Sequence, residues 1–97
     1  MRQNSIPHDI IGTVVPILRQ HHIPKASLFG SYARGEQKPE SDVDILIEVP
    51  KGMTLFGLGG LYSDLKDALR REVDLVQYNY IKPRLKEQIL KDKIDIL

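Results

Sequence analysis

Asp42, Asp44 and Asp74 stand where the sequence otherwise predicts β-strands. Residues two apart on a strand point to the same side, roughly 6.6 Å apart, so Asp42 and Asp44 can reach one cation or a pair of cations. Asp74 can join them if its strand lies beside theirs. Because converging carboxylates repel one another unless a divalent cation neutralises them, this pattern predicts a metal site.

The available donors indicate which metal this site would take. Carboxylate oxygens, completed by water and phosphate, suit Mg²⁺ or Mn²⁺. Zinc prefers Cys and His ligands, and the chain has no Cys and only 3 His, which are badly spaced for a shared ion. We therefore expect Mg²⁺, with Mn²⁺ as an alternative.

A second candidate site is the Gly30–Ser31 corner, where a short predicted strand runs directly into a helical turn. Glycine lets a phosphate approach the backbone, the helix start offers N–H groups, and the Ser31 hydroxyl is a further donor. Gly-Ser alone is a common turn. Followed after ten residues by Asp42, however, it predicts a metal–triphosphate site with a third carboxylate near the attacking hydroxyl.

The elements that must position these residues alternate between helix and strand. Apolar spacing predicts helices over 8–20, 54–70 and 82–91, a helical turn over 31–37, strands over 25–29, 42–49 and 73–78, and a short strand or coil over 94–97. This order predicts one α/β or α+β domain over residues 1–97, with helices covering a small sheet. Periodicity leaves open whether the strands are parallel or mixed.

Prolines, glycines and leucines refine the predicted helices. Pro16 predicts a kink in the first helix, or a restart near Val15. In the helix over 54–70, each glycine costs about 1 kcal/mol, so either its first turns are loose or another backbone approaches there. The helix over 82–91 is expected to begin at Pro83 and to face inward with Leu85, Ile89 and Leu90.

Composition excludes several classes of protein. The chain is 41% hydrophobic and 28% charged, which is typical of a globular domain, and it lacks the cysteines of a disulfide scaffold. A net charge of +1 gives no general reason to bind nucleic acid or an acidic membrane. We find neither a signal peptide after Met1 nor a membrane span of about 18 apolar residues, so we expect a cytoplasmic protein.

Three motifs in order carry a resemblance that spans nearly the whole chain. They are Phe-Gly-Ser-Tyr-Ala-Arg-Gly-Glu over 29–36, Ser-Asp-Val-Asp-Ile-Leu over 41–46 and Val-Asp-Leu-Val over 73–76. Together they resemble the minimal nucleotidyltransferases (MNT) of the DNA polymerase β superfamily, the MntA-like antitoxins of HEPN/MNT toxin–antitoxin systems. The resemblance implies the nucleotidyltransferase fold, a small mixed β-sheet covered by helices.

The resemblance also implies an activity and a role for each site residue. Gly30 and Ser31 would bind the triphosphate of ATP, and Asp42 and Asp44 would ligate both metal ions. Asp74 would complete the catalytic metal site and help to deprotonate the acceptor. The implied reaction transfers AMP from ATP to a hydroxyl, a tyrosine in the family, of a partner HEPN ribonuclease toxin, so that the transferase acts as its antitoxin. Arg34 is a further candidate for orienting the phosphates.

Two other functions stay open. The chain could neutralise a toxin by binding alone, in which case the exposed leucines and glycines of the helix over 54–70 are the place to look for the interface. It could instead act on nucleic acid or a small molecule, although it has neither a basic arm nor an aromatic platform, which disfavours nucleic acid as a ligand. Since 97 residues leave no room for an acceptor-binding domain, we expect a partner protein to bring the acceptor.

Overall fold

The computed structural model describes residues 7–97; residues 1–6, where a signal peptide would begin, lie outside the described residues. None of the described helices is both long and apolar enough to cross a membrane. The elements follow the expected alternation of helix and strand. They are α1 (His8–Gln20), β1 (Lys25–Phe29), α2 (Ser31–Arg34), β2 (Val43–Glu48), α3 (Leu55–Leu69), β3 (Val73–Gln77), the 3₁₀ turn η1 (Tyr78–Tyr80), α4 (Pro83–Asp92) and β4 (Ile94–Asp95).

The four strands form one mixed sheet in the order β3-β2-β1-β4. Strand β1 runs antiparallel to β2 and β4, whereas β2 and β3 are parallel. The mixed sheet that the resemblance implied is therefore confirmed. The order also makes β2 and β3 neighbours, which was the condition for bringing the third aspartate to the first two.

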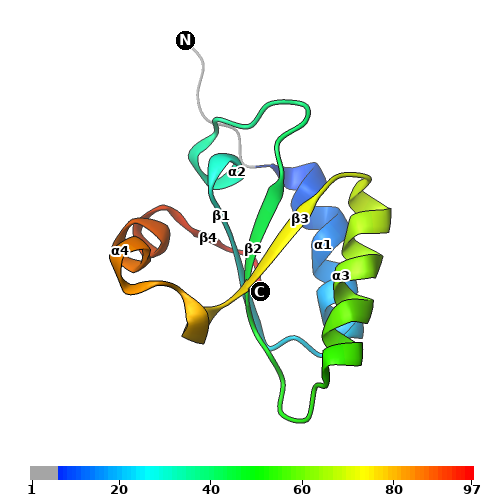
Figure 1. Cartoon of the computed structure of the whole chain (residues 1–97). Helices are drawn as coiled ribbons and strands as arrows, with labels where there is room; N and C mark the ends of the chain where they lie inside the picture. Colours follow the sequence, from blue (N-terminus) through cyan, green and yellow to red (C-terminus); the bar gives the residue numbers. More distant parts are fainter. Residues whose placement is uncertain (1–6) are drawn as a thin grey trace.

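Helices α1 and α3 lie together against one face of the sheet, and α4 lies on the other side (Figure 1). Alternate β2 residues, Val43, Ile45 and Ile47, point into the core between sheet and helices, where Leu18 and Leu61 are also fully buried. Burying each such side chain stabilises the fold by about 1.5–3 kcal/mol. This packing holds the strand rigidly, so the residues between the buried ones have defined positions on the opposite face.

The first two helices differ from expectation at their interruptions and ends. Helix α1 runs through Pro16 as one helix and does not restart at Val15. Gly12 and Pro16 are both exposed, so the Gly12 carbonyl that loses its helical partner can be hydrated. Helix α2 ends at Arg34, three residues earlier than expected, because Gly35 adopts a left-handed conformation with φ 72°.

Helix α4 is less buried than its pattern predicted. The expectation that Leu85 and Leu90 face inward is wrong, because their side chains are 47% and 37% exposed, and only Ile89 is partly buried. The spacing of these residues does form a stripe, but α4 contacts the sheet chiefly at β1 and leaves most of that stripe uncovered.

Helix α3 begins at the predicted cap, but its first apolar residue is exposed. The Thr54 side chain caps it by accepting a hydrogen bond of 3.1 Å from the Gly57 N–H. Leu61, Leu65 and Leu69 are buried, whereas Leu55 is 86% exposed. The first turn of α3 therefore projects an apolar side chain beyond the core.

A buried polar cluster ties the C-terminal strand to the sheet. The Ser27 hydroxyl, fully buried in β1, donates to Asp95 Oδ1 over 2.6 Å and also contacts the Tyr78 hydroxyl. Because the single Ser27 proton points to Asp95, the Tyr78 hydroxyl donates to Ser27. Lys93, two residues before Asp95 in the chain, pairs with it and lowers the pKa of that carboxyl, which favours the ionised form that accepts from Ser27.

Candidate active site

Asp44 and Asp74 lie side by side on the parallel strands β2 and β3, at the same register. Asp44 is half-buried and Asp74 is exposed. Asp42 was expected to be part of the strand, but it lies in the loop just before Val43, and its side chain is exposed. The sheet therefore sets the positions of Asp44 and Asp74, and the loop that leads into β2 sets the position of Asp42.

The electrostatics of Asp44 show that the three carboxylates interact. Burial, together with the negative charges of Asp74 and Asp42, raises the pKa of Asp44 to about 6, and Arg34 partly opposes this shift. Such a carboxylate gains from a nearby cation. Within residues 7–97, however, no three acidic or histidine side chains are arranged closely enough to enclose an ion as they stand. The three carboxylates therefore interact electrostatically, but they do not surround a common point as the ligands of a bound ion do.

The Gly30 corner packs directly against this acidic cluster. Gly30 has φ 71° and ψ −148°, a conformation that favours glycine. A Cβ at this position would overlap Asp44 Oδ2 and lie 3.0 Å from its Cγ. Ser31 follows as the first residue of α2. Both candidate motifs, the Gly-Ser corner and the acidic pair, therefore meet in one place.

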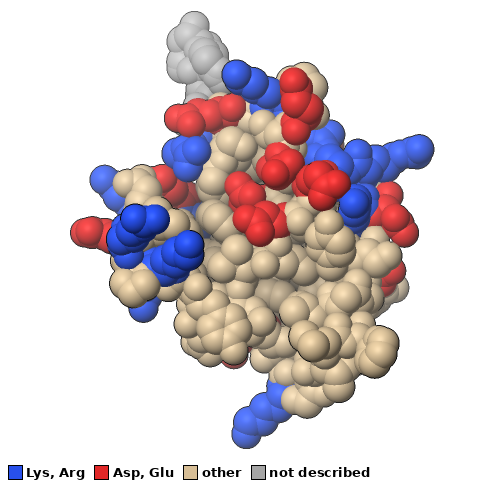
Figure 2. Space-filling model, in the orientation of Figure 1, with Lys and Arg blue, Asp and Glu red and all other residues tan. Residues whose placement is uncertain are grey.

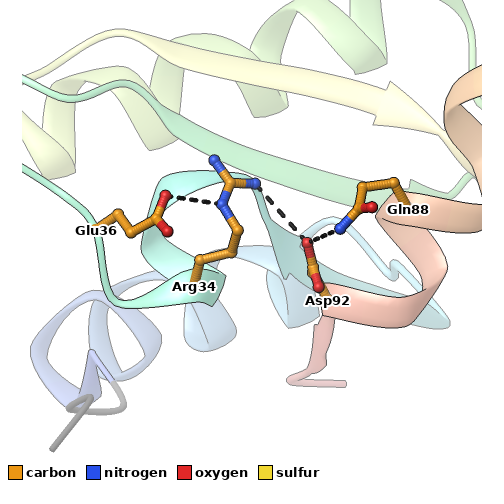
Figure 3. A network of polar contacts seen from close by, with 4 residues as sticks. All are labelled: Arg34, Glu36, Gln88 and Asp92. Atoms are coloured by element: carbon orange, nitrogen blue, oxygen red, sulfur yellow. Dashed lines mark hydrogen bonds and ion pairs between the residues drawn. The ribbon is translucent and has the colours of Figure 1, made fainter.

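Arg34 links this corner to α4, as Figure 3 shows. Its Nε donates to Glu36 over 2.9 Å, and its Nη1 lies 3.9 Å from Asp92, which also accepts a 2.6 Å hydrogen bond from Gln88. Arg34 is thus held by two carboxylates while its charge still acts on Asp44. Gln88 and Asp92 could not be predicted from the sequence, because no local pattern relates residues so far along the chain to α2.

The surface around the site separates charged from uncharged regions. Acidic side chains gather near the upper ends of β2 and β3 in Figure 2, with Lys and Arg on both sides of them. Much of the surface below them is uncharged in this view. The carboxylate oxygens of the half-buried Asp44 and the exposed Asp42 and Asp74 are the kind of ligand that Mg²⁺ and Mn²⁺ take, so the donor chemistry fits the expected metal.

Comparisons with known proteins show the family to which the chain belongs. A protein of Methanocaldococcus jannaschii, named as a protein adenylyltransferase, is 46% identical over 90 residues, which covers 93% of this chain and 97% of that one. The solved structure of a minimal nucleotidyltransferase is similar with a TM-score of 0.76 and 33% identity, over 90% of this chain and 89% of that one.

A further similar structure contains a nucleotide analogue. It is the crystal structure of a toxin–antitoxin with AMP-PNP, which matches with a TM-score of 0.75 and 26% identity, over 90% of this chain and 72% of that one. Residues 13–97 match the family described as Polymerase beta, Nucleotidyltransferase. The chain therefore belongs to the polymerase beta nucleotidyltransferase family.

Proposed function

We propose that this chain is a protein adenylyltransferase that transfers AMP from ATP to a tyrosine hydroxyl of a HEPN-type ribonuclease toxin and so acts as its antitoxin. The observation that carries the proposal is the shared register of Asp44 and Asp74 beside the Gly30 corner. Support also comes from a relative named as a protein adenylyltransferase and from the similar toxin–antitoxin structure with AMP-PNP.

Each site residue has a defined task in this reaction. Gly30 and Ser31 receive the triphosphate, because a backbone without a Cβ and a hydroxyl donor suit phosphate oxygens. Asp42, Asp44 and Asp74 would hold Mg²⁺ or Mn²⁺, which supplies positive charge against the triphosphate when bound. Asp74 also helps to deprotonate the acceptor hydroxyl, whose proton its carboxylate accepts.

The chemistry is a single displacement with no covalent enzyme intermediate. A bond forms between the acceptor oxygen and the α-phosphorus, while the bond from that phosphorus to the bridging oxygen of the β-phosphate breaks and pyrophosphate leaves. The enzyme contributes positioning and charge neutralisation. The raised pKa of Asp44 suits this role, because a bound cation would offset the unfavourable free energy of keeping its carboxylate ionised.

Intact-mass measurement of the toxin tests the proposal. The chain is incubated with a HEPN-type toxin, ATP and Mg²⁺, and the toxin is expected to gain the mass of an adenylyl group, which fragmentation of its peptides should place on a tyrosine. Asp42→Asn and Asp44→Asn should each lower the rate by about 10²-fold or more. The matched control is Asp67→Asn, an exposed aspartate of α3, which should leave the rate unchanged. Equal rates in all variants would contradict the proposal.

A second candidate, neutralisation by binding alone, is favoured by the exposed side chains of Leu55 and Phe56. The two functions differ in what the doubly substituted Asp42→Asn, Asp44→Asn protein does to toxin activity. If AMP transfer is the mechanism, RNA cleavage by the toxin continues in the presence of this variant. If the variant blocks cleavage at the same dose as the unsubstituted chain, binding alone is the mechanism.

A further inference from the structure

An apolar groove runs between α3 and the edge strand β3, the strand that carries Asp74. It has a volume of about 420 Å³, and its walls include Leu55, Leu58, Tyr62, Val73 and Leu75. Its one charged lining residue is Asp74. The groove therefore runs from the start of α3 along the edge of β3 as far as Asp74. The Asp74 side chain alternates with those of Val73 and Leu75, which pack toward α3, so its carboxylate lies on the other face of the sheet, beside Asp44.

The outer end of this groove is unusually apolar and exposed. Leu55 is 86% exposed and its neighbour Phe56 is 94% exposed, higher than the other large hydrophobic residues with exposed side chains. Both belong to the first turn of α3, and Leu55 lines the groove itself. Large apolar side chains held out in water at the end of a groove are typical of a surface that binds another protein.

The wall of the groove contains a glycine that the chain's own packing does not require. Gly59 lies inside α3, where glycine costs about 1 kcal/mol relative to alanine. A Cβ added to it would meet nothing within 4 Å, so no contact within the described residues explains the missing side chain. The absence of a side chain instead keeps the groove open, which allows another chain to approach the helix closely.

The position of β3 adds a second way to hold a partner. Strand β3 ends the strand order, so its outer edge pairs with no other strand among residues 7–97. The backbone groups along that edge can pair with an extended segment of another protein. Alternate apolar side chains of such a segment would then lie between Leu58 and Leu75, which both line the groove, and the side chains between them would lie on the sheet face of Asp74.

We infer that an apolar, extended segment of the acceptor protein docks in the α3–β3 groove and thereby brings its hydroxyl to Asp74. This inference rests on the proposed function. A nucleic acid fits the groove poorly, because its phosphates need Lys or Arg and the groove lining has neither. A second copy of this chain in the groove would cover Asp74 and close the site to the acceptor, whereas the acceptor itself must occupy this approach.

Two pairs of matched variants test the inference. Gly59→Arg fills the groove, and Gly12→Arg places the same side chain on an exposed glycine of α1 that also has open space around it. Leu55→Ser removes an apolar side chain of the groove, and Leu85→Ser removes one from the exposed face of α4. All four positions are exposed or open, so thermal unfolding should report folded protein in each case.

The measurement is the rate of AMP transfer against the concentration of the HEPN-type protein and, separately, of ATP. Gly59→Arg and Leu55→Ser should each raise the KM for the protein acceptor by about tenfold or more, and the KM for ATP should stay within about twofold. Gly12→Arg and Leu85→Ser should change neither value. An unchanged acceptor KM in both groove variants would overturn the inference and leave the proposed function standing.

Two further outcomes separate the groove from the reaction. If the unsubstituted chain transfers no AMP, the proposed function fails, and calorimetry of the same protein pair still tests the groove, because equal affinity in Gly59→Arg would overturn docking there. If sedimentation shows a dimer of this chain that Leu55→Ser and Gly59→Arg dissociate, the occupant is a second copy and the inference is wrong.

Discussion

At the scale of a single residue, the Asp44 carboxylate has an environment that disfavours its negative charge. It is half-buried against the Gly30 corner, and two further carboxylates act on it. Burial and like charge both disfavour its ionised form, so the folded protein loses stability in order to keep a charge at this point. The cost is understandable if that charge serves a bound cation.

Asp44→Asn should therefore stabilise the protein at neutral pH. The pKa of Asp44 is raised from 3.8 to about 6 by folding, so the folded state binds more protons than the unfolded state between these values. The free energy of unfolding consequently falls as pH rises through this window. Because the group is about half exposed, we expect a gain of only about 1 kcal/mol at pH 7.

Thermal unfolding at pH 7 and at about pH 3.5, in the presence of a chelator, measures this effect. The melting temperature of Asp44→Asn should exceed that of the unsubstituted chain by a few degrees at pH 7 and by little or nothing at the lower pH. A variant that is less stable at pH 7 would mean that Asp44 gains more from its neighbours than it loses by burial.

Gly30→Ala should damage both folding and catalysis. The positive φ of Gly30 and the overlap of any Cβ with Asp44 Oδ2 force the corner to move. We expect a loss of about 1–3 kcal/mol of stability and loss of detectable AMP transfer. Gly12→Ala, in exposed helix with open space, should instead gain up to about 1 kcal/mol. Denaturant unfolding of both variants decides this, and equal behaviour would contradict the account of the corner.

At the scale of elements, the polar cluster around Ser27 shows how the C-terminal strand is kept in the sheet. The strand β4 is only Ile94–Asp95, too short to be stable through backbone pairing alone. The hydrogen bond from Ser27 to Asp95 and the contact between Ser27 and Tyr78 join β1, β4 and η1. One buried hydroxyl therefore connects three elements.

Ser27→Ala should lower the free energy of unfolding by about 1–2 kcal/mol, since it removes both hydrogen bonds and leaves Asp95 less well paired. Tyr78→Phe should remove only one of them and cost less. Because both substitutions break the same contact, the double variant should lose less than the sum of the two. Denaturant unfolding measures all three, and simple additivity would show that the two hydroxyls do not interact.

Local sequence patterns predicted most helices and strands, whereas the features that they did not predict depend on long-range packing. The alternation of β2, the Thr54 cap and the Gly30–Ser31 corner depend on neighbours in sequence, so they could be predicted. The exposure of Leu85, and the contact of Arg34 with Asp92, depend on how α4 packs against the sheet. Likewise, the sequence motif identified Asp74 as a candidate, but only the strand order places it beside Asp44.

At the scale of the whole molecule, the fold gives its two faces different tasks. One face of the sheet is covered by α1 and α3 and supplies the core (Figure 1). The other carries the carboxylates at one end of the parallel pair β2 and β3. Since α3 also forms a wall of the groove along β3, the helix that stabilises the sheet borders the proposed docking surface as well.

We propose that Asp42, Asp44 and Asp74 act with the Gly30–Ser31 corner as one metal–nucleotide site. Calorimetric titration of ATP into the full chain, with Mg²⁺ and then with a chelator, tests it most directly. We predict that ATP binds with Mg²⁺, and that binding is lost with the chelator and in the doubly substituted Asp42→Asn, Asp44→Asn protein. Binding of equal strength without Mg²⁺, or in that variant, would contradict the claim.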